Sequence, residues 1–491
     1  MKKIIALFFL MLLALAPIGL VPLNLLVMSF PEWAVLVALL AAAVVSMGYL
    51  MLFQTKLVAK ILLPLCLVVS ICLSVFGSLC NPYWNSVSFR VCDATRSYDQ
   101  TLSPEEAKED LAFALRCMKK CHPLFLGGTP DNVQKAYQAA AARLEKSKSV
   151  TVNDLRREMQ SVLSVMGDAH TSVWGKWDDE VYVPSVARRR QEGWRLVGIN
   201  GRKVESIFEQ NKKLYSYEAE SWAEHQMTND FFCLSGVDYL GLIDKDLVVY
   251  TWENEKRKQE NDGYTVEDFV TLEKYREINA EYLAAQEEES FVSYTIDEEK
   301  SLALLTLREC RWNQEYTDCL HQMFAEVKAQ GIRHVAVDLR GNGGGNSLVA
   351  NEFLRYLPVK SYKEVTYRWR LGWLILSNDR QTSENEAYDD LTFDGNVYVL
   401  TDASSFSSAM MFAEYIKDNR LGTLIGEAPG NTPSGYGDIA IFQMPHSGLL
   451  LHVSTKQFFR ADKECADALV EPDIPCESVQ ALDVLYEQIG E

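Results

Sequence analysis

The stretch 396-NVYVLTDASSFSSAMMFAEY-415 passes from an apolar run rich in β-branched and aromatic residues into an apolar run with helical spacing. Four serines, at positions 404, 405, 407 and 408, crowd the turn between the two runs. A serine at the first turn of a helix can cap the free N–H groups there, or it can react next to the positive end of the helix dipole. The stretch therefore predicts a strand, a turn and a helix, and leaves two roles open for the serines.

The same alternation of strand and helix patterns extends along the chain from Ser301 onward. Strands that alternate with helices predict a mostly parallel sheet whose short loops carry function. A later pair of apolar runs predicts a β-hairpin around Pro445–Gly448. The expected strands are Leu302–Leu307, Val335–Leu339, Val397–Leu400 and Thr423–Ile425, the expected helices are Gln314–Gln330, Leu348–Tyr356 and Ser407–Lys417, and the hairpin strands are Ile439–Met444 and Leu449–Ser454.

The first 80 residues differ from the rest because they contain three long apolar runs. Each run is long enough to cross a bilayer core of about 30 Å as a helix. A cleaved signal peptide is the alternative for the first run, since Lys2-Lys3 and Ala14-Leu15-Ala16 fit one, but the apolar run continues past Pro17. We therefore expect three retained transmembrane helices, within Ile4–Met28, Ala34–Phe53 and Ile61–Leu79.

The lysines around these runs predict the orientation of the chain in the cell membrane. Lys2 and Lys3 precede the first run, and Lys56 and Lys60 lie between the second and the third. The connection between the first and second runs has no Lys or Arg. Because positive charge is enriched on the cytoplasmic side, the N-terminus is expected inside and the region after the third run outside.

Composition and charge limit the function of this extracytoplasmic region. A net charge of −19 makes nucleic acid an unsuitable partner. The eleven cysteines include no C-x-x-C pair with zinc spacing, although an exported location would permit disulfides. The glycine-rich segment 341-GNGGGNS-347 lacks the third glycine of a dinucleotide fingerprint, and the chain has no G-K-[ST] of a P-loop.

The chain divides into five regions by these patterns. The helical part starts at Ser103-Pro104-Glu105-Glu106, which has the order of an N-cap, a proline and a capping-box glutamate. Within the next part, 195-RLVGINGRKVESIF-208 predicts a strand, an Asn-Gly turn and a strand that enters a helix. The expected regions are a membrane anchor (1–80), a linker (81–102), a helical unit (103–166), a strand-rich region with a charged helical insertion at Tyr264–Glu289 (167–290) and a core (291–491).

A serine nucleophile needs a base and a pocket for the oxyanion. Among the histidines, His170 stands out, because it lies in a turn within 168-DAHT-171, after a helix and before an apolar strand pattern. The glycine-rich bend after Val335–Leu339 could direct its N–H groups at an oxyanion. The plain alternatives are a helix cap for the serines, a polar turn for His170 and a simple turn for the glycines.

Taken together, the motifs resemble the tail-specific, C-terminal-processing serine peptidases, particularly the branch with the tricorn core and the interphotoreceptor retinoid-binding repeats. The matching pieces occur in the order of the family and extend over Ser103–Pro475. The resemblance implies an α/β fold with a crotonase- and Clp-like β-α-β superhelical core. The pieces are 168-DAHT-171, 198-GINGRKV-204, 335-VAVDLRGNGGGN-346, 399-VLTDASSFSSA-409 and 425-IGEAPGN-431.

The resemblance assigns Ser407 as the nucleophile and His170 as the general base. It implies that the backbone N–H groups of Gly343, Gly344 and Ser408 bind the oxyanion. One branch of the family uses a lysine shortly after its G-E pair, but 426-GEAPGNTPSGYGD-438 has none, which favours a Ser/His mechanism. The group that orients the imidazole is expected downstream, at Asp462 rather than the nearby Glu464 or Glu471, with Asp168 as a local alternative.

The expected function is that of a membrane-anchored serine peptidase that hydrolyses exported or membrane polypeptides. The resemblance implies no metal ion and no organic cofactor. Two alternatives remain on the same scaffold: a non-catalytic protein that binds peptides or hydrophobic ligands, and a hydrolase of another class such as a thioesterase. The piece 195-RLVGINGRKV-204 resembles part of a PDZ-like module, which would bind extended peptides by strand addition.

Overall fold

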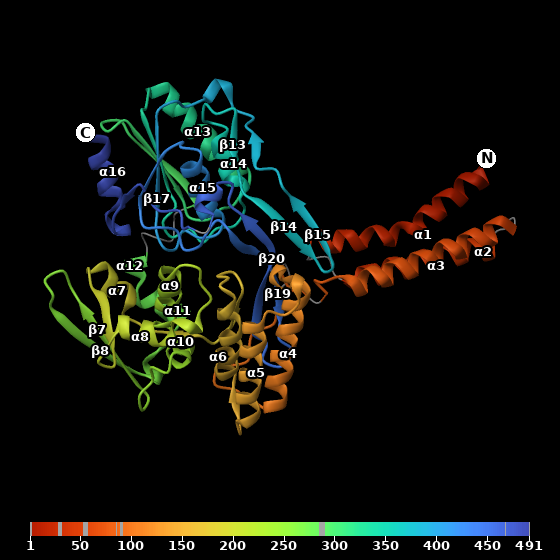
Figure 1. Cartoon of the computed structure of the whole chain (residues 1–491), viewed down its shortest axis with the longest axis horizontal. Coiled ribbons are helices and arrows are strands. Elements are labelled where there is room, and N and C mark those ends of the chain that lie inside the picture. Colours follow the sequence, from red (N-terminus) through yellow and green to blue (C-terminus); the bar gives the residue numbers. More distant parts are fainter. Residues whose placement is uncertain are drawn as a thin grey trace.

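The computed structural model describes residues 2–27, 32–52, 57–84, 86–88, 92–283, 290–466 and 468–490. The N-terminal part forms three long helices, α1 (Lys2–Val27), α2 (Glu32–Leu52) and α3 (Leu57–Cys80). They pack against one another and project from the rest of the molecule as a narrow bundle (Figure 1). Each is long and apolar enough to cross a membrane. The connections 28–31 and 53–56, including Lys56, lie outside the described residues, so the orientation stays a prediction.

Three amphipathic helices follow, in the segment expected to be a helical unit. The first begins with a capping box, in which the Ser103 side chain accepts from the Glu106 N–H and the Glu106 carboxylate accepts from the Ser103 N–H. Their apolar faces pack together and against a hairpin from the end of the chain. A short antiparallel pair of strands joins the segment before the first helix to the segment between the second and the third. The elements are β1 (Thr101–Leu102), α4 (Pro104–Cys121), α5 (Asp131–Lys146), β2 (Val150–Thr151) and α6 (Val152–Leu163).

The C-terminal part contains a six-stranded sheet in the order β10-β11-β12-β17-β18-β21. The pairing of β10 with β11 is antiparallel and the other pairings are parallel, which confirms the expected mostly parallel sheet and the mixed α/β class. The crotonase-like superhelix stays a prediction. The strands are β10 (Val292–Asp297), β11 (Leu302–Leu307), β12 (His334–Asp338), β17 (Asn396–Thr401), β18 (Thr423–Gly426) and β21 (Ile474–Pro475).

Helices cover both faces of this sheet. Alternate residues of each strand point to opposite faces, so Ala303 and Leu305 pack in the larger core while Leu302 packs with α16 on the other side. The larger core lies between the sheet and α13, α14 and α15. The bounds are α13 (Gln314–Gln330), α14 (Leu348–Leu354), α15 (Ser408–Asp418) and α16 (Ala481–Gly490), with a separate strand pair β13 (Ser361–Lys363) and β16 (Thr382–Glu384) nearby.

A second, antiparallel sheet connects the core to the helical unit. Its order is β15-β14-β20-β19, and β3 pairs with β20. The expected hairpin at the end of the chain is confirmed as β19 and β20. The pairing of β3 with β20 joins the segment after 168-DAHT-171 to the C-terminal part. The strands are β3 (Ser172–Trp174), β14 (Thr366–Leu371), β15 (Leu374–Asn378), β19 (Gly435–Gln443) and β20 (Leu450–Phe459).

The region between His170 and the core forms a separate lobe around the sheet β6-β5-β7-β8 (Figure 1). The expected Asn-Gly turn joins β5 to β6, with positive φ at Asn200 and Gly201. The expected helical insertion at Tyr264–Glu289 contains, in its described residues 264–283, the end of β8, a short 3-10 helix, β9 and two short helices, and residues 284–289 lie outside the described part. The elements are β4 (Val181–Tyr182), α7 (Val186–Gln191), β5 (Arg195–Ile199), β6 (Arg202–Lys203), α8 (Val204–Asn211), α9 (Glu220–Asp230), α10 (Leu234–Tyr239), β7 (Leu247–Glu253), β8 (Gln259–Thr265), β9 (Val270–Thr271), α11 (Leu272–Ile278) and α12 (Ala280–Leu283).

Candidate active site

Ser407 and His170 line the same cleft, although they lie in distant parts of the sequence. The cleft has a volume of about 640 Å³. Its walls come from the glycine-rich bend, from the start of α15, and from strands β14, β15, β19 and β20. The rings of His170 and Phe406, which precedes Ser407, pack with their centroids 4.5 Å apart. The two residues expected to react therefore share one concave site.

The backbone of Ser407 adopts φ 56° and ψ −116°, between the end of β17 and the start of α15. A non-glycine residue in this region is strained, and such strain persists where the surrounding structure holds it. The Ser407 N–H donates to Asn431 Oδ1 at 2.7 Å, which ties the turn to the loop after β18. A sharp, strained strand-to-helix turn is how α/β-hydrolases expose a nucleophilic serine.

The four serines of this turn have different partners. Ser404 Oγ donates to Asp402 Oδ1, Ser405 Oγ donates to the Leu339 carbonyl and Ser408 Oγ donates to the Gly345 carbonyl, each at 2.8 Å. Among the described residues, the Ser407 hydroxyl has no hydrogen-bond partner and it faces the cleft. Three of the serines therefore hold the turn, and the fourth is available for chemistry.

The glycine-rich bend approaches the Ser407 turn very closely. A Cβ at Gly344, where φ is +99°, would lie 2.7 Å from the Phe406 carbonyl oxygen and 2.8 Å from Ser407 Cβ. No side chain fits there, which explains the glycine. The Gly344 N–H, however, donates to Asn342 Oδ1 at 2.9 Å, and Gly343 is not among the residues lining the cleft.

The expected oxyanion donors therefore need a correction. The Gly344 N–H is already used inside the bend, because Asn342 folds back under it. Gly345 and Ser408 line the cleft instead, and no acceptor for either N–H is found within the described part of the chain. Ser408 is the first residue of α15, where the N–H has no partner within the helix. The geometry thus keeps Ser408 among the expected donors and favours Gly345 over Gly343 and Gly344.

His170 is held by the turn that follows α6 and precedes β3. The His170 N–H donates to Asp168 Oδ1 at 2.9 Å, and His170 Nδ1 lies 3.9 Å from the same oxygen. Within the described residues, neither ring nitrogen has a hydrogen-bond partner. Burial lowers the pKa of His170, and the charges of Asp168 and Asp438 only partly oppose this. The imidazole is therefore neutral near pH 7, as a general base must be.

Asp168 lies completely buried behind His170. Its Oδ2 atom accepts from His122 Nε2 at 2.8 Å and from Thr171 Oγ1 at 2.5 Å. Burial by itself would raise its pKa, but the His122 hydrogen bond, the His122 and His170 charges and the Thr171 hydroxyl together lower it to about 2. Asp168 is thus a fixed carboxylate beside the imidazole.

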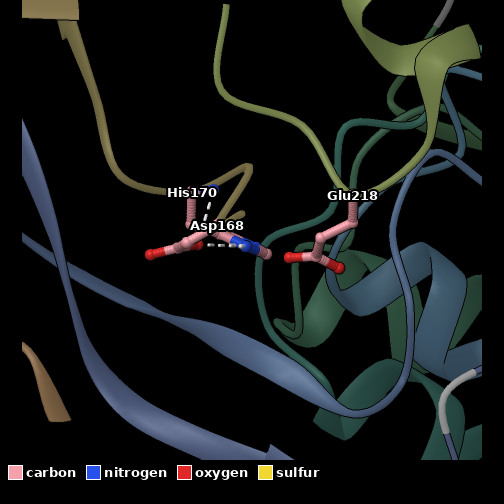
Figure 2. Close-up of side chains that lie close together, drawn as sticks. All are labelled: Asp168, His170 and Glu218. Carbon is pink, nitrogen blue, oxygen red and sulfur yellow. Dashed lines mark hydrogen bonds and ion pairs between the residues drawn. The ribbon is translucent and has the colours of Figure 1, made fainter. Parts of the chain in front are cut away.

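Glu218 is a member of this site that the sequence patterns did not indicate. A carboxylate oxygen of Glu218, a ring nitrogen of His170 and a carboxylate oxygen of Asp168 all lie within 4.8 Å of one another. Figure 2 shows the imidazole pointing toward the Glu218 carboxylate, with Asp168 on its other side. Glu218 Oε2 accepts from the Thr432 N–H at 2.7 Å and from Thr432 Oγ1 at 2.8 Å. Burial and the Asp168 charge raise the pKa of Glu218 to about 7.

Asp462, the expected orienting group, lies elsewhere. It is the N-cap of a short 3-10 helix at Lys463–Cys465, where its Oδ1 accepts from the Glu464 N–H at 3.0 Å. It is not among the residues lining the cleft. The chain leaves β20 before this point, which carries Asp462 away from His170. The local alternative, Asp168, lies beside the imidazole, with Oδ1 3.9 Å from His170 Nδ1.

Asp168, His170 and Glu218 also form a group whose size would suit a metal ion. Catalytic zinc sites use three such protein ligands. In this group, the Asp168 oxygens already accept from His122, Thr171 and the His170 backbone, and one Glu218 oxygen accepts twice from Thr432. The donor set therefore fits a hydrogen-bonded network around a histidine better than an open metal site.

Comparisons with known proteins concern the family and the fold of the region that holds this cleft. Residues 301–476, within the C-terminal part of the chain, match the model of peptidase family S41. The expected resemblance to C-terminal-processing peptidases is thereby confirmed. A comparison with curated proteins found no sequence match.

Solved structures with a similar fold include mature CPAF, with a TM-score of 0.55 and 12% identity over 79% of this chain and 95% of that chain. Mature CPAF complexed with lactacystin gives a TM-score of 0.53 at 12% identity, over 79% and 97%. The photosystem II D1 C-terminal processing protease gives 0.42 at 13% identity, over 78% and 97%. At these identities the likeness to CPAF is one of fold.

Proposed function

We propose that the protein is a membrane-anchored serine peptidase in which Ser407 is the nucleophile and His170 the general base. The observation that carries this proposal is the unpartnered Ser407 hydroxyl on a strained turn, in the same cleft as a buried neutral imidazole. The match to peptidase family S41 supports hydrolysis of peptide bonds. Both residues match the motif positions expected for these roles.

The proposed reaction is acyl transfer to water. His170 takes the proton from Ser407 as the Ser407 oxygen attacks the peptide carbonyl, and later gives a proton to the leaving amine. The Gly345 and Ser408 N–H groups receive the oxyanion, where one well-placed donor lowers the barrier by about 3 kcal/mol. Asp168 faces Nδ1 at 3.9 Å, which leaves Nε2 to exchange the proton.

The His170 ring makes no hydrogen bond to Ser407 in the structure. Apo sites often have long catalytic contacts that shorten when substrate binds. The contact between the His170 and Phe406 rings places the imidazole beside the residue that precedes Ser407. Asp168 replaces Asp462 in this proposal, because Asp168 is the carboxylate next to the ring.

The three apolar helices support a location in the cell membrane, and the lysines around the three apolar runs favour the extracytoplasmic side for the peptidase. Exported or membrane polypeptides are then the natural substrates. The walls of the cleft include the polar side chains of Asn346, Asn351 and Asn378, which can bind a peptide backbone.

Labelling of the full chain with a fluorophosphonate tests the proposal. We expect labelling of the wild type, none of Ser407→Ala, and reduced labelling of His170→Ala. Ser404→Ala is the matched control, because its hydroxyl lies in the same turn but is bonded to Asp402. A folded wild type that stays unlabelled would point to a non-catalytic binding protein. Labelling without peptide cleavage, but with thioester cleavage, would point to another class of hydrolase.

A further inference from the structure

The hairpin of β14 and β15 ends in an exposed apolar tip. Trp373 at the turn is 75% exposed, and the next three residues, Leu374, Ile375 and Leu376, are 43%, 43% and 41% exposed. Successive residues of a strand point to opposite faces, so both faces of β15 are uncovered. Because β15 is also the edge strand of its sheet, four consecutive large apolar side chains face the surroundings. A contiguous exposed patch of this kind marks an interaction site.

This tip lies beside the end of the third apolar helix. A Cβ at Gly372 would lie 3.4 Å from the carbonyl oxygen of Cys80, the last residue of α3, and 3.7 Å from Pro82 Cδ. Figure 1 shows the hairpin reaching toward the base of the helical bundle. The hairpin and the end of the apolar bundle are therefore at the same level.

Hydrogen bonds fix this arrangement. The Tyr83 hydroxyl donates to the Arg370 carbonyl at 2.9 Å, and Trp369 Nε1 donates to the Tyr83 hydroxyl at 3.0 Å. Arg370 in turn donates to the carbonyl oxygens of His122 and Lys119 at the end of α4. The hairpin is thus tied both to the segment that leaves α3 and to the helical unit.

We propose that the tip formed by Trp373–Leu376 inserts into the interface of the lipid bilayer that α1–α3 span. The proposal rests on the membrane anchoring in the proposed function. The apolar span of α3 ends at Gly77, only a few residues before the contact with Gly372. Tryptophan and flanking apolar side chains favour the membrane–water interface. With α1–α3 spanning a bilayer, lipid lies next to the end of α3 and therefore next to the tip.

The other end of the same hairpin lines the candidate active site. Tyr367 on β14 and Asn378 on β15 contribute to the walls of the cleft. The strand from Trp373 back to Tyr367 spans roughly 20 Å at about 3.3 Å per residue. Insertion of the tip therefore holds the cleft at a set height above the lipid. The substrates that reach it are extended segments next to the membrane in anchored polypeptides.

Quenching of tryptophan fluorescence by lipids with brominated acyl chains tests the proposal on the full chain in lipid nanodiscs. The difference between the emission of the wild type and of Trp373→Phe isolates Trp373. We expect brominated lipid to remove most of this difference emission. Trp312→Phe is the matched control, because Trp312 is exposed on the core, and its difference emission should be unchanged.

Two results would overturn the proposal. Trp373 emission that is unaffected by brominated lipid and open to an aqueous quencher means that the tip lies in water. Trp373 emission protected from both quenchers means that a protein, such as a second copy of the chain, covers the tip. Fluorophosphonate labelling of Ser407 is measured in the same nanodiscs, so failure of the lipid contact and failure of the peptidase assignment are told apart.

A substrate comparison supplies the second readout. The double variant Leu374→Asp/Ile375→Asp should cleave a soluble peptide at the wild-type rate, and lose most of its activity on the same peptide anchored to the nanodisc. Equal rates on both substrates would contradict the stated height of the cleft above the membrane.

Discussion

His122 Nε2 lies 2.8 Å from Asp168 Oδ2, and both side chains are completely buried. The Leu124 N–H donates to His122 Nδ1 at 3.0 Å, so the proton of a neutral His122 is on Nε2 and points to Asp168. Asp168 turns its other oxygen to His170. A histidine from the end of α4 thus holds the carboxylate that faces the proposed base.

Replacement of His122 by alanine should therefore lower activity through Asp168. Without this donor, a buried carboxylate oxygen loses one of its two partners, which costs about 1–3 kcal/mol of unfolding free energy. We expect kcat to fall by roughly tenfold or more, as a shift of about 1.4 kcal/mol in the barrier gives, with KM little changed. Steady-state kinetics with a peptide substrate measures both constants.

His122→Gln should recover part of the lost kcat, because its amide can donate to the same oxygen. His321→Ala is the control, since His321 is exposed on α13. If His122→Ala lost stability but kept the wild-type kcat, His122 would be a structural residue only.

The strain at Ser407 predicts an unusual order of stabilities. Glycine adopts a positive φ without steric cost, whereas alanine keeps the strain. Ser407→Gly should therefore be more stable than Ser407→Ala, by about 1–3 kcal/mol. Thermal unfolding of the two inactive variants measures the difference. At Ser404, which has no positive φ, the order should be the reverse, because glycine gains more conformational freedom on unfolding. The same order at both positions would remove the argument for a strained nucleophile.

The pH dependence of activity should reflect His170. Burial lowers the pKa of His170, so its neutral form persists below the ordinary value of about 6.5. We expect kcat/KM to rise with pH and to reach half its maximum below pH 6.5. A midpoint well above pH 6.5 would mean that the charges of the carboxylates around the ring raise the pKa of His170 more than burial lowers it. Peptide cleavage measured from pH 4.5 to 8 decides between these outcomes.

Glu218 should make the folded state less stable as pH rises. Its folded pKa of about 7 lies above its ordinary value, so the folded state binds the proton more tightly than the unfolded state does. The stability from protonated Glu218 is complete below about pH 4.5 and is lost as pH rises through about 7. The loss is on the order of 3 kcal/mol.

Glu218→Gln tests this directly, because the amide stays neutral at every pH. We expect the melting temperature of the wild type to fall between pH 5 and pH 8. The melting temperature of Glu218→Gln should stay nearly constant over the same range. Glu220→Gln, two residues away on the exposed start of α9, is the matched control and should behave as the wild type does. Parallel melting curves for wild type and Glu218→Gln would contradict a raised pKa.

Removal of divalent metal ions should leave the activity unchanged, because the Ser/His mechanism uses only side chains and backbone N–H groups. The three side chains Asp168, His170 and Glu218 could nonetheless bind an ion. Peptide cleavage before and after treatment with EDTA distinguishes the two cases. Loss of activity that returns with added zinc would show that this group acts as a metal site.

Much of the fold could be predicted because helix and strand patterns are local properties. The repeats of 3.6 and 2 residues place apolar side chains on one face, and this was sufficient for α13 and for the hairpin of β19 and β20. Caps act within one turn, so the start of α4 followed from Ser103 and Glu106. The turn with its four serines was also a local prediction, since the strand, the turn and the helix are consecutive, whereas the resemblance to the C-terminal-processing peptidases selected Ser407 among them.

The sequence by itself determined which segments form strands and helices, and that a cluster of serines and a histidine stand at turns. Only the tertiary structure decided what surrounds them. The pairing of β3 with β20 brings His170 to the cleft. Hydrogen bonds between distant segments place His122 beside Asp168 and hold Glu218 at Thr432. Asp462 caps a short 3-10 helix outside the cleft. The physical reason is that these neighbours depend on strand pairing and buried hydrogen bonds between distant segments, which no local period in the sequence encodes.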